Sequence, residues 1–228
     1  NSPEALEEPI WMHLKKKNYI KQNFIQVHEL TNYDLEFYNK LINLVKIKYN
    51  KNMYLSKNNF NILRIESLLN YFKQSYFFII FRNPLEQANS LFKQHLNFLK
   101  MQKENKFVLE YMDLLGHYDF GLNHKFYYLN SEINETNNYL DLNYWLSSWI
   151  NVYSYLCKFK NKYKNCKFIC YENLCNEKKD YLKIFIPNET KILNSINFNN
   201  FINKNKNIDE NKFDNSLVKK STSLYLKL

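Results

Sequence analysis

The segment Phe81-Arg82-Asn83-Pro84 combines residue types that bind anions. It places an arginine at the end of an apolar run, directly before two residues that commonly start helices. Ser90 follows eight residues after Arg82 and can present a hydroxyl to the crevice that the guanidinium faces. A guanidinium fork together with a hydroxyl binds phosphate well. The structural alternative is an arginine paired with a carboxylate and a serine bonded to its own helix.

The elements around Arg82 follow the pattern of an α/β fold. Residues 76–81 are a short apolar run that predicts a strand buried on both faces of a parallel sheet, and residues 167–171 predict a second such strand. Apolar residues at helical spacing predict a helix over 62–72. Ligands of parallel sheets bind at the carboxyl ends of the strands, which is where Arg82 is expected to lie.

A helix is predicted to begin directly after Arg82. Asn83 is a suitable N-cap, Pro84 suits the first turn, and Glu86 stands at the third position of a capping box. The free amide groups and the dipole at this helix start favour an anion. The expected buried stripe of the helix consists of Leu85, Ala88, Phe92, Leu96 and Leu99. A later helix is predicted over 144–156, with its aromatic residues in the core.

Several segments together resemble one known family. Residues 78–84, followed by Ser90, look like the 3′-phosphate-binding signature of sulfotransferases that use 3′-phosphoadenosine 5′-phosphosulfate (PAPS), of the bacterial or glycan type. Similar stretches are residues 55–59 with Arg64, 94–95, 111–112, 116–121 and 168–174. The resemblance implies a P-loop-like three-layer α/β fold, in which helices flank a central parallel sheet.

The resemblance also implies roles for individual residues. Arg82 and Ser90 would hold the 3′-phosphate of PAPS, and Tyr171 would lie near the adenine, in a stretch similar to the family's Tyr-Glu-Asp-Leu. Residues 2–11 look like the segment that carries the catalytic glutamate in glycan sulfotransferases. This points to Glu8, and after it Glu7, as the general base. Ordinary surface acids at a helix start are the alternative interpretation.

Four further polar residues are compared with the same family pattern. Lys57 matches a lysine that can offset charge on the transferred group, and a solvated lysine is the alternative. Asn59 stands where other sulfotransferases have a histidine base, and because an amide cannot act as a base, a carboxylate base is favoured. His117 is a secondary candidate for the acceptor site, and His95 is assigned to packing.

The chain contains only two glycines, Gly116 and Gly121, so it holds no glycine-rich phosphate loop. The family's N-terminal phosphate loop and first strand are therefore expected to be missing, and so is a C-terminal phosphate-contacting segment. The chain by itself is expected to be an inactive fragment. A single domain is predicted over residues 1–228, with residues from about 194 to 228 partly disordered.

The resemblance implies one function, and two alternatives stay open. The 228 residues carry a formal net charge of +10, which attracts polyanions, but the lysines are spread along the chain as on ordinary solvated faces. The expected function is transfer of a sulfuryl group from PAPS to a hydroxyl or amine of a glycan, lipid, peptide or small metabolite, without a metal. A P-loop-like nucleotide kinase and a basic nucleic-acid-binding module are the alternatives.

The cysteines and the hydropathy of the chain indicate its thiol chemistry and its relation to membranes. Cys157, Cys166, Cys170 and Cys175 show no metal-ligand spacing, so free thiols are predicted rather than zinc ligands or disulfides. No apolar run has the length of a membrane span, so no stable membrane insertion is expected. We expect no nucleic-acid partner and a bacterial cytoplasmic location, or the Golgi lumen if an N-terminal anchor is missing. The oligomeric state stays open.

Overall fold

The computed structural model describes residues 7–129, 138–186, 190–200, 202 and 208–228. Residues 2–6 of the glutamate-bearing segment, and residues 201 and 203–207 of the C-terminal stretch, lie outside the described residues. Two compact units can be distinguished, unit 1 with residues 1–73 and 94–132 and unit 2 with residues 74–93 and 133–228. Each unit is described by itself. The single domain over residues 1–228 stays a prediction.

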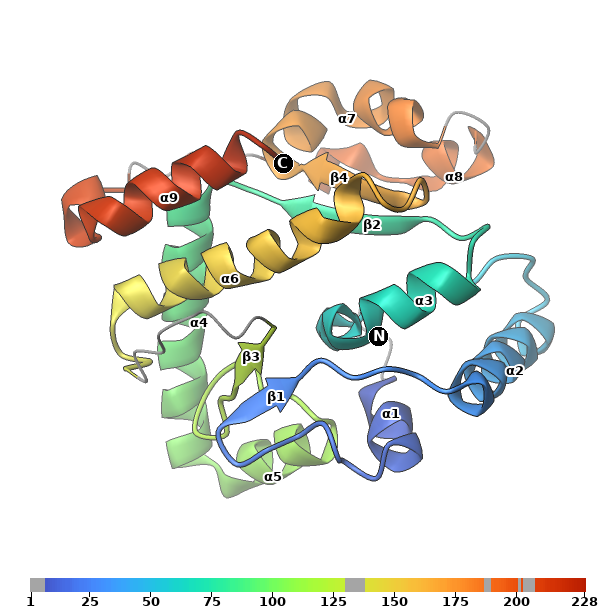
Figure 1. Cartoon of the computed structure of the whole chain (residues 1–228), viewed down its shortest axis with the longest axis horizontal. Helices are drawn as coiled ribbons and strands as arrows, with labels where there is room; N and C mark the ends of the chain where they lie inside the picture. Colours follow the sequence, from blue (N-terminus) through green and yellow to red (C-terminus); the bar gives the residue numbers. More distant parts are fainter. Residues whose placement is uncertain (1–6, 130–137, 187–189, 201, 203–207) are drawn as a thin grey trace. The chain divides into compact units, whose positions relative to one another are not determined.

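Unit 1 is mainly helical. In chain order its elements are α1 (Glu8–Leu14), β1 (Phe24–Gln26), α2 (Asn32–Lys48), the 3-10 helix η1 (Asn59–Arg64), α3 (Ile65–Tyr71), the second half of α4 (Pro84–Glu104), α5 (Lys106–Leu114) and β3 (Phe126–Tyr128) (Figure 1). Helix α2 starts on a capping box between Thr31 and Asp34, as its sequence favours. The helix predicted over 62–72 corresponds to the end of η1 and the whole of α3.

Unit 2 contains the strand and helix that flank Arg82. In chain order its elements are β2 (Phe77–Phe81), the first half of α4, α6 (Leu142–Lys160), β4 (Cys166–Cys170), α7 (Tyr171–Phe185), α8 (Thr190–Ser195), the 3-10 helices η2 (Phe198–Asn200) and η3 (Glu210–Lys212), and α9 (Asn215–Tyr225). Helix α6 includes the whole predicted span 144–156, and its tryptophans Trp145 and Trp149 are buried as expected.

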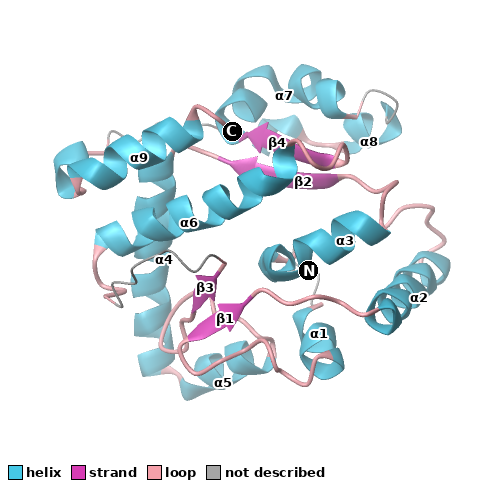
Figure 2. Ribbon diagram, viewed as in Figure 1, coloured by secondary structure: helices cyan, strands magenta, loops and turns pink. Residues whose placement is uncertain are grey.

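Each unit has one parallel pair of strands among its described residues (Figure 2). In unit 1, β1 pairs with β3, and in unit 2, β2 pairs with β4 in the register Phe81 to Cys170. The protein is thus a mixed α/β protein. The expected burial of β2 on both faces is wrong, because Phe78 and Ile80 point to an exposed face and Ile80 is 54% exposed.

Helix α4 buries a different stripe from the one its apolar residues predict. Leu85 and Ala88 are buried, but Leu96 is 41% exposed, and the stripe continues through His95 and Gln102 instead. The polar side chains are satisfied in place, since His95 Nδ1 accepts the N–H of Gly121 and Gln102 Oε1 accepts the N–H of Leu122. A hydrogen-bonded polar group can replace an apolar one in a core. The assignment of His95 to packing agrees with its burial.

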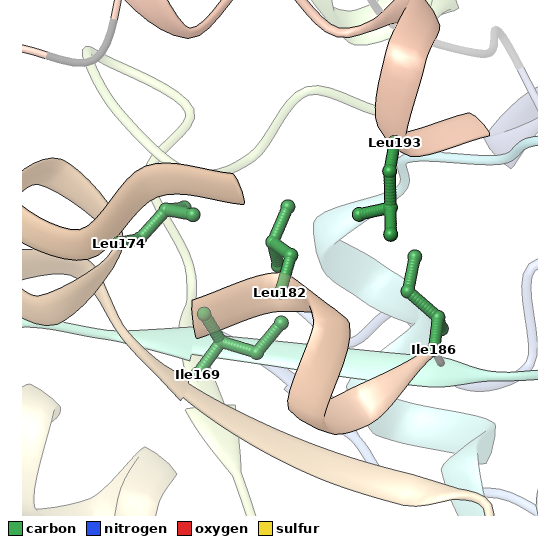
Figure 3. Packing of buried hydrophobic residues seen from close by; sticks show 5 residues of the cluster. All are labelled: Ile169, Leu174, Leu182, Ile186 and Leu193. Atoms are coloured by element: carbon green, nitrogen blue, oxygen red, sulfur yellow. The ribbon is translucent and has the colours of Figure 1, made fainter. Parts of the chain in front are cut away.

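The C-terminal stretch of unit 2 includes a helix. Helix α9 starts on the cap Asp214, which accepts the N–H groups of Ser216 and Leu217, and packs against α6. Partial disorder of residues 194–228 stays a prediction. Figure 3 shows the apolar cluster that holds α7 and α8 on β4, which consists of Ile169, Leu174, Leu182, Ile186 and Leu193.

The four cysteines are free thiols, as predicted. Cys166, Cys170 and Cys175 are buried and Cys157 is half-buried. Burial raises the pKa of the Cys166 thiol to about 11 and also raises that of Cys157. These two thiols stay protonated at neutral pH and behave as small apolar side chains.

Three histidines of unit 1 make its stability depend on pH. Burial lowers the pKa values of His28, His95 and His124 from 6.5 to about 4, with the Arg64 charge contributing at His28. The unfolded chain therefore binds more protons than the folded chain between these values. Stability is expected to be complete above about pH 6.5 and to fall as the pH drops toward 4. Urea unfolding at pH 7.5 and pH 5 measures this loss.

His95→Asn is the matched variant for the pH experiment. Asparagine offers an oxygen acceptor to the Gly121 N–H that His95 Nδ1 accepts, but it does not titrate. The difference in unfolding free energy between pH 7.5 and pH 5 should be smaller in this variant. An equal difference in the variant and the wild type would show that His95 does not contribute.

Candidate functional site

Arg82 and Tyr171 meet at one edge of the parallel pair in unit 2. Phe81 and Cys170 are paired in register, and each is the last residue of its strand, so Arg82 and Tyr171 are the first residues beyond the carboxyl ends. The guanidinium carbon of Arg82 lies 6.0 Å from the centre of the Tyr171 ring. Arg82 and Tyr171, two of the three residues assigned to a nucleotide from the sequence, are therefore adjacent.

The start of α4 is capped by Asn83, as predicted, but it has fewer open backbone N–H groups for an anion than expected. Asn83 Oδ1 accepts the N–H groups of Leu85 and Glu86 at 3.0 and 3.1 Å, and Pro84 has no N–H. These first-turn amides are already used within the chain, so they are not available to an anion as the sequence suggests. Anion binding at this edge has to rely on the Arg82 side chain and on the helix dipole.

The Arg82 guanidinium is only partly compensated. Its closest carboxylate is Glu86, with Oε2 3.6 Å from Nη2, and the Arg82 side chain is 29% exposed. Among the described residues, the buried Nε atom of Arg82 has no hydrogen-bond partner. Ser90 lies six residues into α4 and is exposed. Arg82 thus has a long ion pair with Glu86 and a partly exposed side chain.

Glu8 of unit 1 is a buried carboxylate whose acceptor positions are filled. Arg64 Nη2 donates to both oxygens, at 2.8 Å to Oε1 and 2.7 Å to Oε2. The Tyr19 hydroxyl donates to Oε1, and the Asn58 side-chain amide donates to Oε2 at 2.9 Å. The alternative of a surface acid is therefore wrong for Glu8. A general base needs an open lone pair, and the described arrangement leaves none on Glu8.

Glu7 is also buried, and it is held by hydroxyl groups. Tyr38 donates to Oε1 at 2.9 Å, Tyr54 donates to the same oxygen, and Ser56 donates to Oε2 at 2.7 Å. The surface-acid alternative is therefore wrong for Glu7 as well. Three hydroxyl donors therefore satisfy the buried carboxylate.

Lys57 lies in the segment 54–58, whose side chains alternate between two sides. Tyr54, Ser56 and Asn58 alternate along the chain and bond to Glu7 or Glu8, whereas Leu55 and Lys57 between them are exposed. This alternation is that of an extended segment, whose side chains point to opposite sides in turn. Lys57 therefore stands on the side opposite to the residues that bond to the two glutamates. The structure brings Glu7 and Glu8 together and leaves Lys57 apart.

The glycine-flanked segment lies over Glu8. Gly116 has a positive φ of 73°, and a Cβ there would lie 2.9 Å from Glu8 Cγ and 2.7 Å from Met12 Sδ. His117 is half-buried, and its Nδ1 is 3.8 Å from Asp119 Oδ2. A glycine is required at 116 both by the backbone angle and by the close approach to Glu8.

Arg64 is the central residue of this cluster, and no role was assigned to it from the sequence. Its side chain is buried, with its guanidinium carbon 4.8 Å from the Trp11 ring centre and 5.5 Å from that of Tyr19. A signal was present, because Arg64 and Arg82 are the only arginines among 32 basic residues. A chain that otherwise uses lysine keeps arginine where a planar fork binds carboxylate or phosphate.

Comparisons with known proteins add no assignment to this geometry. No protein-family model matches the chain, and neither a curated protein nor a solved structure is significantly similar to it. Within the described part of the chain, none of the helices combines the length and apolar character that crossing a bilayer requires. The functional interpretation therefore depends on the side chains described above.

Proposed function

We propose that the protein is a PAPS-dependent sulfotransferase that transfers a sulfuryl group to a hydroxyl or amine of a glycan, lipid, peptide or small metabolite. The observation that carries the proposal is the position of Arg82 and Tyr171, side by side beyond two paired parallel strands. Ligands of parallel sheets bind at this edge. The proposal includes the P-loop-like three-layer fold, of which the parallel pair of β2 and β4 would be a part.

The residues of unit 2 would hold the nucleotide. Arg82, with its unused Nε–H, and the exposed Ser90 hydroxyl would bind the 3′-phosphate, and the Tyr171 ring would lie near the adenine. The part of the Arg82 side chain that is exposed would reach the phosphate, and a hydrogen bond from a guanidinium to a phosphate is charge-assisted. PAPS, when bound, would supply the activated sulfuryl group.

The residues of unit 1 would act on the acceptor. The acceptor hydroxyl must lose a proton as it attacks, and Glu8 and Glu7 are the proposed bases. Because the acceptor positions of Glu8 are occupied, a donor has to leave before Glu8 can take a proton. Releasing a neutral donor, Asn58 or Tyr19, costs less than releasing Arg64, which would separate two buried charges.

The proposal is tested by calorimetric binding of two nucleotides to the full-length protein. 3′-Phosphoadenosine 5′-phosphate should bind more tightly than adenosine 5′-phosphate. Arg82→Ala should weaken binding of the first about 10- to 100-fold, which corresponds to the roughly 1.5–3 kcal/mol of a charged hydrogen bond, and should leave the second nearly unchanged. Lys93→Ala, at an exposed position of the same helix, controls for the loss of one positive charge.

Each contrary outcome points to a different function. Equal affinity of the wild type for the two nucleotides would contradict the sulfotransferase proposal. Preference for a nucleoside triphosphate would favour a nucleotide kinase. Steeply salt-dependent binding of oligonucleotides without preference for the 3′-phosphate would favour a nucleic-acid-binding module.

A further inference from the structure

We propose that Glu172 is a positioning residue for the nucleotide site, which keeps Arg82 beside Tyr171 without touching the ligand. The inference rests on the function proposed above, because it concerns the same edge of β2 and β4. Glu172 directly follows Tyr171 in the first turn of α7. No role was assigned to it from the sequence.

The first oxygen of Glu172 links the two strand ends. Oε1 accepts the backbone N–H of Asn83 at 2.7 Å, and Asn83 directly follows Arg82. The carboxylate therefore joins the residue after Tyr171 to the residue after Arg82. A hydrogen bond from a backbone N–H to a carboxylate is short and strong, so it limits how far the two chain segments can separate.

The second oxygen of Glu172 links this edge to α9. Oε2 accepts the Tyr225 hydroxyl at 3.1 Å and the Cys170 thiol at 3.2 Å. Burial raises the pKa of Tyr225, so the phenol stays protonated and keeps donating. The Tyr225 ring also packs edge-on against Phe81, with ring centres 5.6 Å apart. Glu172 thus has hydrogen-bond partners at the cap of α4, on β4 and on α9.

Glu172 also replaces the usual partner in the capping of α4. In a capping box the N–H of the cap residue is bonded by the side chain three positions later, which here is Glu86. Glu172 takes that N–H instead, and Glu86 Oε2 lies 3.6 Å from Arg82. The bonded atoms of Glu172 face the backbone and the Tyr225 phenol. This is the position of a residue that orients Arg82, since a carboxylate in direct contact with a phosphate would repel it.

The test uses Glu172→Ala and Glu172→Gln in the full-length protein, with Glu177→Ala as a control. Glu177 is exposed on the same helix, so its removal changes the charge equally. Glutamine retains the oxygen that accepts the Asn83 N–H and loses the negative charge. The two measurements are amide hydrogen exchange at Asn83 and the affinities for 3′-phosphoadenosine 5′-phosphate and adenosine 5′-phosphate.

In Glu172→Ala, exchange at Asn83 should become about tenfold faster or more, and affinity for the 3′-phosphorylated nucleotide should fall about tenfold. Affinity for adenosine 5′-phosphate should change little, and Glu172→Gln should restore most of both losses. If the wild type prefers the 3′-phosphorylated nucleotide, two results for Glu172→Ala would overturn the role of Glu172 but not the proposed function. They are unchanged amide exchange at Asn83 and an unchanged preference for the 3′-phosphate. Absence of any preference in the wild type overturns the proposed function and, with it, the nucleotide role of Glu172.

Discussion

Arg64→Met is expected to destabilise the protein by about 3–5 kcal/mol, the cost of leaving a buried charge without its partner. The Arg64 side chain is 0% exposed and donates to both oxygens of the buried Glu8. The thioether of methionine fills much of the same space between Trp11 and Tyr19 but donates no hydrogen bond. Urea denaturation at pH 7.5, followed by circular dichroism, measures the loss.

Two further variants separate charge from packing. Adding Glu8→Gln to Arg64→Met removes the orphaned charge and should recover a large part of the lost stability, as expected for a coupled pair. Arg82→Met removes the other arginine, whose side chain is 29% exposed, and should cost less than about 1 kcal/mol, as for a surface ion pair. Equal losses of unfolding free energy in Arg64→Met and Arg82→Met would contradict the expected cost of the buried Arg64 charge pair.

Gly121→Ala is expected to cost about 2–4 kcal/mol, from backbone strain of about 1–2 kcal/mol and a comparable loss of hydrogen bonding. Gly121 has a φ of 85°, and a Cβ there would lie 2.1 Å from Gln102 Oε1. Gln102 cannot retreat freely, because the same oxygen accepts the Leu122 N–H at 2.6 Å and its amide nitrogen contacts Met112 Sδ at 3.1 Å. Thermal unfolding measures the effect.

The pair with Gln102 provides the control for this prediction. Gln102→Ala removes the atoms with which the new methyl group would collide, so the two substitutions together should cost less than the sum of the single ones. The remaining cost is the strain of the positive φ. Strict additivity would show that the methyl group and Gln102 do not compete for space.

The elements closest to Arg82 were predictable from local sequence. The apolar run 76–81 forms β2, Asn83 caps α4, and the aromatic span 144–156 lies within α6. These predictions succeeded because strand propensity, capping and helical periodicity depend on residues a few positions apart. The position of Arg82 beyond its strand follows from the same local signals. Tyr171 was expected to end a strand over 167–171, but β4 ends at Cys170 and Tyr171 begins α7.

The buried polar residues were not predictable in the same way. His95 and Gln102 occupy the place of apolar residues in α4, because partners at Gly121 and Leu122 satisfy them. Glu7 and Glu8 are acids at a helix start in sequence, yet donors from 11 to 56 positions along the chain surround them. Two sequence signals marked Arg64, namely the rarity of arginine and its place in a stretch that resembles the family, but neither predicted its bond to Glu8.

The sequence by itself determined the α/β character and the strand and capped helix around Arg82, because these follow from short-range preferences. Only the tertiary structure decided that the first amides of α4 are used by Asn83, that Glu7 and Glu8 are buried acceptors, and that Glu172 bonds to Asn83. The physical reason is that burial and hydrogen-bond partners depend on segments far apart in the chain, whose pairing no local pattern encodes.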